Sequence, residues 1–182
     1  MRKLRVFISS TMEDLKEERM ELAKAIDKNR FWKAVYAETF VARSKSPREV
    51  CLEEVRESHI YIGIFKNRYG YIPKHYNPQG FSVVALEYNE AKNNGIPILI
   101  FIHKDSKNRE AQLRDFLKEI TDFDTGHWRK EYSDIEELVK FAIEAIEHEI
   151  TERAVRSIEE ERKKNVKDIY NLPYLQRLKR IL

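Results

Sequence analysis

Short apolar runs alternate along the chain with longer segments in which apolar side chains recur every three or four residues. The runs predict β-strands, and the longer segments predict helices that bury one face. The first helical segment, for example, has an apolar stripe of Leu15, Leu22 and Ile26. The expected strands are residues 4–9, 33–40, 59–65, 96–102 and 127–129, and helices are expected from residues 10, 46, 82, 107 and 133.

Residues with well-known capping roles mark several helix ends. Residues 46–49 (Ser-Pro-Arg-Glu) combine an N-cap, a proline at the first helical position and a glutamate that can close a capping box. Residues 10–13 (Ser-Thr-Met-Glu) have the same spacing and predict a helix that starts directly after the first strand. Asn94-Gly95 predicts a helix end. Residues 171–173 (Asn-Leu-Pro) predict a break before a short final helix.

The alternation of strands and helices predicts an α/β fold, because parallel strands need helical crossovers between them. Residues 59–65 form a continuous apolar run, as expected for a central strand that is buried on both faces. We therefore expect a flavodoxin-like three-layer sandwich with a five-stranded parallel sheet in the order 2-1-3-4-5. This domain would span residues 1–150, and a charged helical extension would span residues 151–182.

Charge is distributed unevenly between these two parts. The 182 residues include 34 Lys and Arg against 31 Asp and Glu. Residues 151–182 hold nine basic and five acidic side chains, whereas residues 1–150 hold 25 and 26. A nearly neutral domain and a tail of mixed sign do not favour a nucleic-acid partner. The bias towards Glu and Lys, with three Gln, is typical of thermophilic proteins.

Motifs that the sequence lacks narrow the class of protein. No stretch approaches the ~18 uncharged apolar residues of a membrane span, and the N-terminal apolar run is too short for a signal peptide, so we expect a cytoplasmic protein. The chain has five glycines and contains no G-x-G-x-x-G, P-loop or G-x-S-x-G motif. Cys51 is the single cysteine, and no two histidines are spaced as ligands on one helix face, so no metal site is expected. Cys51 is interpreted as a buried thiol.

Sheets of this type bind ligands at the carboxyl ends of the strands, where the strand order reverses. Here that place is the cleft between the loop after the first strand, with Ser9, Ser10 and Thr11, and the long loop at residues 66–80. The hydroxyls and amides of the first loop could receive a phosphate at a helix N-terminus, or Ser10 or Thr11 could simply cap the helix. Loops as long as residues 66–80 are usually functional in a compact domain.

Glu87 is the candidate catalytic residue. It falls in the first turns of the helix that follows the long loop, so its carboxylate would face the same cleft. A glutamate in a partly apolar cleft can act as a nucleophile, or it can stabilise an oxocarbenium ion at C1 of a sugar. A glutamate near a helix N-terminus is also favoured by the helix dipole alone, and the spacing does not decide between these interpretations.

Three stretches of the sequence resemble a bacterial and archaeal family of domains of unknown function, DUF family 4062. The first is residues 6–19 (VFISSTMEDLKEER), the second includes residues 57–65 (ESHIYIGIF) and 68–71 (RYGY), and the third includes residues 80–91 (GFSVVALEYNEA). The resemblance covers about residues 4–103. The family is similar to a wider group that includes TIR domains and nucleoside 2-deoxyribosyltransferases, which implies a flavodoxin-like sheet.

The resemblance also implies an activity. Glu87 matches the glutamate that, in the wider group, cleaves or transfers an N-glycosidic bond in NAD or a nucleoside. NAD or a nucleoside would then be the substrate, and no cofactor is implied. Serine hydroxyls and a guanidinium would hold phosphate or ribose hydroxyls, and aromatic rings would stack on a base. The ligand-binding residues would be Ser9, Ser10, Thr11, Phe65, Arg68 and Tyr69, with Ser9 forming the floor of the cleft and Tyr69 its wall.

The alternative is a non-enzymatic signalling or interaction module. Such a domain would sense a nucleotide or bind a protein partner and would serve a larger NTPase-type or defence protein, since similar domains often precede NTPase or repeat domains. The apolar stripe of the last long helix continues through Ala154 and Ile158, which favours packing into a homo-oligomer or against a partner domain. One departure weakens the enzymatic interpretation. Family members usually carry Ser-Asp where this chain has Ser58-His59, so an acidic group that could assist is missing.

Overall fold

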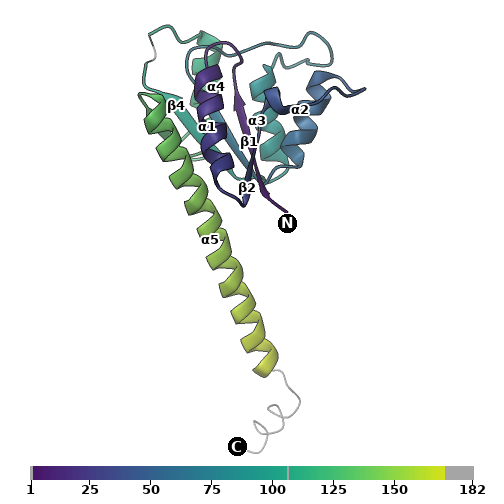
Figure 1. The fold of residues 1–182 in the computed structure, drawn as a ribbon, viewed down its shortest axis with the longest axis vertical. Coiled ribbons are helices and arrows are strands. Elements are labelled where there is room, and N and C mark those ends of the chain that lie inside the picture. The colour runs from purple at the N-terminus through teal and green to yellow at the C-terminus, as the bar shows by residue number, and fades with distance from the viewer. Residues whose placement is uncertain (1, 106, 171–182) are drawn as a thin grey trace, which may run out of the picture. The chain divides into compact units, whose positions relative to one another are not determined.

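The computed structural model describes residues 2–105 and 107–170 (Figure 1). Its five parallel strands lie in the order β2-β1-β3-β4-β5, which confirms the predicted α/β fold and strand order. The sheet lies wholly in the first of two compact units, residues 1–145 and residues from 146 onward. The strands are β1 (Leu4–Ser10), β2 (Trp32–Val35), β3 (Ile60–Phe65), β4 (Ile98–His103) and β5 (Arg129–Tyr132). The helices are α1 (Lys16–Lys28), α2 (Pro47–Arg56), α3 (Val83–Asn93), α4 (Ala111–Ile120) and α5 (Ile135–Tyr170), with a short 3-10 helix η1 (Ala37–Thr39).

Strand β3 occupies the centre of the sheet, as its apolar sequence predicts, and the hydroxyl of Tyr61 is its one polar side-chain group. All six of its residues are buried. It pairs with β1, where Ser9 lies opposite Gly63, and with β4, where Leu99 lies opposite Ile62. At the two edges, β2 and β5 have four residues each, and three of the four residues of β5 are exposed. The burial gradient from centre to edge matches the apolar content of the strands.

Successive side chains of β1 point to opposite faces of the sheet, so Ser9 and Ser10 contact different helices. Phe7 belongs to the core cluster that includes side chains of α2, α3 and α4, and Ser9 points to the same side. Ser10 points to the other side, where it contacts Arg19 of α1. Two adjacent serines at the end of one strand therefore serve different helices.

The predicted start of the first helix is wrong. Residues 10–13 do not form a capping box, and α1 begins at residue 16 without a side-chain cap. The carbonyl oxygens of Thr11 and Met12 accept hydrogen bonds from Arg19, at 3.1 and 3.5 Å. Because these oxygens are bound from the side by a guanidinium, the segment after β1 stays a turn instead of adding a first helical turn.

The second strand is shorter than predicted. It ends at Val35, and η1 follows where the sequence predicted the strand to continue to residue 40. The reason is again Arg19, because η1 presents Glu38 to its guanidinium. The edge strand β5 begins at Arg129, slightly later along the chain than predicted.

The last long helix was predicted to carry an apolar stripe beyond the core. In the first unit, Leu138 and Ala142 of α5 are fully buried, as the stripe predicts. In the second unit, Ala154 and Ile158 are exposed, and 66% of Ile158 is accessible. The predicted break at residues 171–173 and the short final helix lie outside the described residues.

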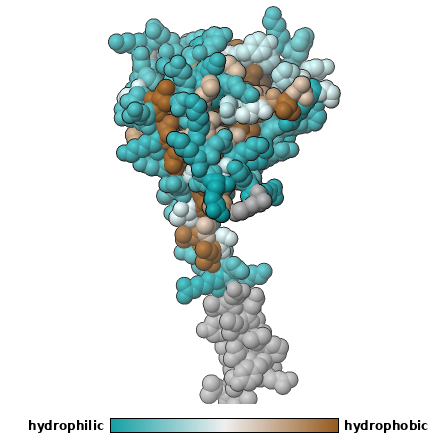
Figure 2. All heavy atoms as spheres, viewed as in Figure 1, coloured by the Kyte–Doolittle hydropathy of each residue, from teal (hydrophilic) through white to brown (hydrophobic). Residues whose placement is uncertain are grey.

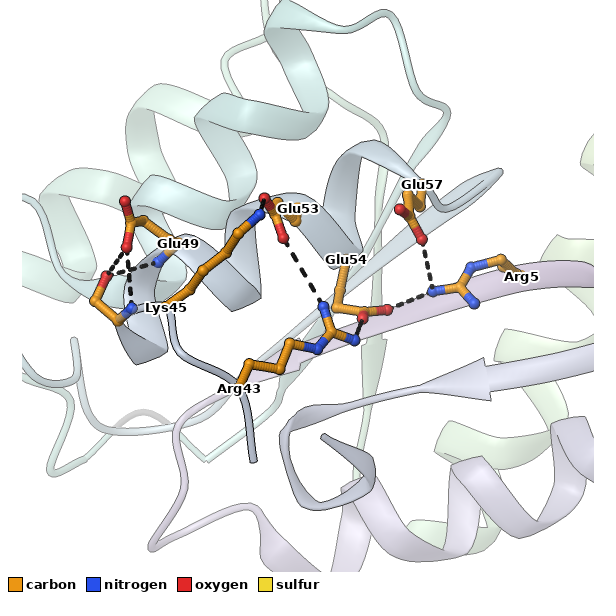
Figure 3. A network of polar contacts seen from close by, with 8 residues as sticks. Arg5, Arg43, Lys45, Glu49, Glu53, Glu54 and Glu57 are labelled. Carbon is orange, nitrogen blue, oxygen red and sulfur yellow. Dashed lines mark hydrogen bonds and ion pairs between the residues drawn. The ribbon is translucent and has the colours of Figure 1, made fainter. Parts of the chain in front are cut away.

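A network of ion pairs ties β1 and the segment before α2 to that helix (Figure 3). Glu54 of α2 is buried, and its carboxylate accepts from Arg5 of β1 and from Arg43. Arg43 also lies 3.8 Å from the carboxylate of Glu53, which pairs in turn with Lys45. The predicted start of α2 is confirmed, since the Ser46 hydroxyl caps the helix and the Glu49 carboxylate closes the box at 2.9 Å.

The surface seen in Figure 2 is mostly hydrophilic, with small hydrophobic areas between the polar ones. Scattered apolar side chains of this kind are normal on a folded domain. No helix in the described part of the chain is long and apolar enough to pass through a lipid bilayer.

Candidate active site

A cavity of about 470 Å³ opens at the carboxyl ends of β1 and β3, next to the point where the strand order reverses. The loops after β1 and β3, together with η1, α1, α2 and α3, supply its walls. A volume of this size is typical of small-molecule sites. The cavity is lined by Phe7, Ile8, Ser10, Thr11, Met12, Glu13, Arg19, Ala37, Cys51, Arg68, Gly70, Tyr71, Val83, Val84 and Glu87.

The Glu87 side chain is buried and borders the cavity. The Ser82 hydroxyl caps α3 by accepting from a helix amide at 3.2 Å, so that Glu87 falls on the face towards β1. The Ser9 hydroxyl donates to Oε2 of Glu87 at 2.5 Å. Gly63 of β3 lies opposite Ser9, and a larger residue would not fit there, because its Cβ would come within 2.8 Å of the Phe65 ring. The sheet and α3 thus hold the carboxylate in one place.

The charge of Glu87 is compensated only in part, by the charge of Arg19. Among the side chains that the structure describes, none forms an ion pair with it. Burial raises the pKa of Glu87 to about 7, although hydrogen bonds from Ser9 and Cys51 and the charge of Arg19 act in the opposite direction. Near neutral pH the carboxyl group is therefore divided between its two protonation states, as suits a group that exchanges protons or charge in a reaction.

Two further polar groups lie close to Glu87. Cys51 of α2 is partly exposed and lines the cavity, where the sequence suggested a buried thiol. Burial and then the charge of Glu87 raise the pKa of Cys51 to about 12. Burial and the same charge also raise the pKa of Tyr61 on β3. Of these three groups, Glu87 is the one that titrates near neutral pH.

Arg19 is a fully buried arginine that fixes the loop after β1. Its Nε donates to both carboxylate oxygens of Glu38, at 3.1 and 3.0 Å, and its Nη1 donates to the Ser10 hydroxyl at 2.7 Å. Burial raises the pKa of Glu38, but the hydrogen bonds and charge of Arg19 outweigh it and leave that pKa below its ordinary value. Since Arg19 also lines the cavity, one side chain connects η1, the loop and the site.

At the rim of the cavity, an ion pair joins the two loops. Arg68 from the loop after β3 contacts the carboxylate of Glu13 from the loop after β1. Both side chains are well exposed, with 44% and 75% of their surfaces accessible. Exposed pairs of this kind contribute little stability, so the two charges separate easily.

The structure brings most of the predicted site residues together. Ser10, Thr11, Arg68 and Glu87 line the cavity, and Ser9 lies directly behind Glu87 without lining it. The Ser9 hydroxyl is therefore occupied by Glu87 and does not form an open floor.

Phe65 and Tyr69 are not brought to the cavity. Both rings pack edge-on against Phe116 of α4, with centroids 6.0 and 5.9 Å apart, and both residues are buried in the core. The aromatic side chains that do line the cavity are Phe7 of β1 and Tyr71, which is 70% exposed. The wall predicted at position 69 is supplied two residues later.

Sequence reasoning did not assign several residues to the site, among them Arg19, Cys51 and Tyr71. Arg19 carried a usable signal, because it falls on the same helix face as Leu15, Leu22 and Ile26, where a charge needs a buried partner. Cys51 gave no comparable signal, since small apolar residues are common on inner helix faces. Tyr71 was one of several aromatic residues in the long loop, and its orientation depends on tertiary packing.

The departure from the family pattern at position 59 lies away from the cavity. His59 directly precedes β3, at the opposite end of that strand, and its Nδ1 accepts from the backbone amide of Arg5 at 3.0 Å. A histidine there does not change the charge around Glu87. Within residues 2–105 and 107–170, no cluster of three or more His, Cys, Asp or Glu side chains is arranged to hold a metal ion.

Solved structures of two proteins resemble this one at low sequence identity. The TIR domains of the activated Roq1 resistosome align with a TM-score of 0.52 and 12% identity over 79% of this chain and 99% of theirs. This similarity concerns the fold. A CMP N-glycosidase of Clostridium botulinum, BcmB, aligns with a TM-score of 0.46 and 16% identity over 76% of this chain and 98% of its own.

Two curated relatives are far longer than this chain. The mouse (Mus musculus) protein named telomerase protein component 1 is 33% identical over 125 aligned residues, which cover 52% of this chain and 5% of the relative. Its rat (Rattus norvegicus) counterpart is 32% identical over 123 residues, with the same coverage of 52% and 5%. Residues 5–148 match the family described as "Domain of unknown function (DUF4062)". The chain belongs to this family.

Proposed function

We propose that this domain binds a nucleotide-like ligand in the cavity and that Glu87 cleaves or transfers the N-glycosidic bond of NAD or a nucleoside. The observation that carries the proposal is the state of Glu87: it is buried at the edge of a ligand-sized cavity, without a cationic partner in the described chain, and its pKa is raised to about 7. Structural carboxylates in protein interiors are normally paired, whereas unpaired ones with a raised pKa concentrate at functional sites.

The reaction needs a carboxylate next to C1 of the ribose. In its ionised form, Glu87 forms a bond to C1 while the bond from C1 to the base nitrogen breaks, and the electron pair leaves with the base. Water or a second acceptor then displaces the carboxylate and takes the sugar. A pyridinium base such as nicotinamide leaves as a neutral molecule without a proton, so this substrate requires no additional acid.

The remaining groups would orient the ligand. Ser9 holds the carboxylate from behind, and Arg19 keeps the loop with Ser10 and Thr11 in place. Arg68 at the rim would bind a phosphate, since a guanidinium matches phosphate oxygens in geometry and charge. A phosphate would replace Glu13 as its partner.

A second candidate function is a non-enzymatic module within a longer protein. The observation that favours it is the size of the curated relatives, because the similar segment makes up 5% of their length. The domain would then sense a nucleotide and pass the signal to neighbouring domains or to further copies of itself. The exposed Val155 and Ile158 of α5 are suitable for contacts with such a partner.

One experiment separates the two candidates. The purified protein is incubated at high concentration with NAD and with nucleosides, and released base is measured by chromatography beside Glu87→Gln. The enzymatic function predicts release by the wild type and a loss of at least about 1,000-fold in the variant. Binding without release supports the sensing function. Equal release by both proteins removes Glu87 from the reaction.

A further inference from the structure

A second hollow adjoins the Glu87 cavity, and the proposed reaction gives it no role. Its volume is about 850 Å³. Three residues line both hollows: Cys51 of α2, Tyr71 of the loop after β3, and Val83 at the start of α3. The two spaces therefore meet at a common boundary, which includes the exposed side chain of Tyr71.

The walls of the second hollow are of mixed chemistry. Leu52 and Pro73 supply apolar surface, and the ring of Tyr76 supplies an aromatic face. Lys74 and His75 add basic groups from the same loop, and α2 adds one charge of each sign, from Arg48 and Glu49, so basic groups outnumber the single carboxylate. Aromatic faces stack on nucleobases, and basic side chains bind the phosphates attached to them, so the combination suits a base that is carried on phosphate.

The loop is held in a costly conformation at this hollow. Tyr76 has a backbone φ of 52°, in the left-handed region that large side chains rarely adopt. Arg48 of α2 donates from Nη1 to the carbonyl oxygens of His75 and Tyr76, at 3.2 and 2.9 Å, and so fixes the turn. The result is a tyrosine ring that is 93% exposed beside the hollow. Strained residues that present exposed groups in this way concentrate at binding sites.

We infer that the two hollows form one elongated site, and that the second hollow binds a further aromatic base joined through phosphates to the nucleoside held at Glu87. The ligand class is then a dinucleotide and not a free nucleoside. The inference rests on the proposed function, because the Glu87 cavity must hold the first half of the ligand. The linking phosphates would lie between Arg68 and Lys74, which come from the same loop.

Affinities for a matched pair of ligands test this inference. NAD and nicotinamide mononucleotide share the part expected at Glu87, and only NAD has the second base. Both are titrated calorimetrically into the full chain carrying Glu87→Gln, which prevents consumption of the ligand. In this background NAD should bind at least about tenfold more tightly than the mononucleotide, as expected for one additional stacked base.

Variants of the second hollow test whether the difference in affinity between NAD and the mononucleotide arises there. Tyr76→Gly removes the ring and relieves the backbone, and Leu52→Trp fills the space. Each should lower the affinity for NAD about tenfold and leave that for the mononucleotide within about twofold. Trp128→Ala is the matched control, because Trp128 is an aromatic residue, 90% exposed, that lines neither hollow.

Each result that contradicts an expectation can be assigned either to the inference or to the proposed function. Equal affinities for NAD and the mononucleotide overturn the inference and leave the proposed function intact. Equal losses for both ligands in Tyr76→Gly and Leu52→Trp also overturn it. If neither ligand binds, the inference and the proposed function both fail. If the expected affinities are found but the wild type releases no nicotinamide, the inference stands and the proposed catalysis fails.

Discussion

Two buried glutamates on neighbouring helices have opposite surroundings. Glu54 of α2 and Glu87 of α3 are each 6% exposed. Glu54 accepts from the guanidinium groups of Arg5 and Arg43 (Figure 3), whereas Glu87 accepts from the neutral hydroxyl of Ser9. Burial alone therefore does not distinguish the paired carboxylate of Glu54 from the carboxylate of Glu87, for which we propose a catalytic role. The two glutamates differ in whether a neighbouring cation pairs with the negative charge of the carboxylate.

The positions of the two residues in the sheet explain this difference. Glu54 is near the C-terminal end of α2, where arginines from β1 and from the segment before α2 reach it. Glu87 lies at the carboxyl ends of the strands, where a cavity separates it from the surrounding loops. One carboxylate joins segments of the chain, and the other lines a cavity.

Replacing Glu87 should stabilise the protein, and this is the largest effect expected on stability. Its pKa is raised from 4.5 to about 7. Between these values the unfolded chain is ionised and the folded protein is not, so the free energy of unfolding falls by about 1.4 kcal/mol per pH unit. The total loss is about 3 kcal/mol, complete above pH 7. Glu87→Gln should therefore be more stable than the wild type by about this amount at pH 8 and equal to it at pH 4.

Urea unfolding at pH 4, 6 and 8 measures this difference. The control is Glu90→Gln, on the same helix and partly exposed, where Glu90 pairs with Arg56 at the surface. If Glu87→Gln is no more stable than the wild type at pH 8, the charge of Glu87 is compensated after all and its contrast with Glu54 disappears.

Replacing Glu54 should have the opposite effect. Glu54→Gln leaves Arg5 and Arg43 without their common carboxylate, and we expect a loss of about 2 kcal/mol in the free energy of unfolding. The loss stays moderate because 23% and 35% of the two arginine side chains are accessible to water. Glu53→Gln serves as the matched control, with an expected loss below about 0.5 kcal/mol. Chemical denaturation at pH 7 gives both values, and equal losses would show that burial of Glu54 is unimportant.

Much of this arrangement follows from local sequence. The apolar runs predict β1, β3 and β4, and the strand order is confirmed because right-handed crossovers restrict the topology. The two edge strands have weaker patterns, and the bounds predicted for them are wrong. The capping residues Ser46 and Ser82 predict the starts of α2 and α3 correctly. The placement of Glu87 at the cleft follows from the second of these, since the helix start sets which residues face β1.

The details that failed depend on contacts between different elements of the fold, some of which are far apart in the sequence. The capping box at residues 10–13 is absent because Arg19 binds the backbone oxygens that a helix would use. The Tyr69 side chain points into the core because its ring packs against the ring of Phe116, which belongs to a helix far along the chain. The protonation of Glu87 depends on burial and on Ser9, 78 residues away. No local pattern contains this information.

The pH dependence of base release should identify the active form of Glu87. If the ionised carboxylate attacks C1, the rate rises about tenfold per pH unit below pH 7 and levels off above it. Ser9→Ala removes the hydrogen bond that most favours the ionised form, so the midpoint moves to higher pH. Cys51→Ala should move it in the same direction and by less. A rate that falls as pH rises through 7 would instead make Glu87 a proton donor.

The smallest effect on stability is expected for Glu13, an exposed glutamate at the rim of the cavity. Its surroundings differ from those of both Glu54 and Glu87. Glu13 pairs with Arg68 in full contact with water, so Glu13→Gln should change the free energy of unfolding by less than about 0.5 kcal/mol. It should nevertheless raise the affinity for a nucleoside monophosphate about threefold and leave that for the nucleoside unchanged, because a phosphate no longer competes with the carboxylate for Arg68. Calorimetric titration of both ligands measures the effect, and Arg68→Gln is the counterpart that should remove the preference for phosphate. If Glu13→Gln strengthens both ligands equally, Glu13 blocks the entrance sterically and Arg68 does not recognise phosphate.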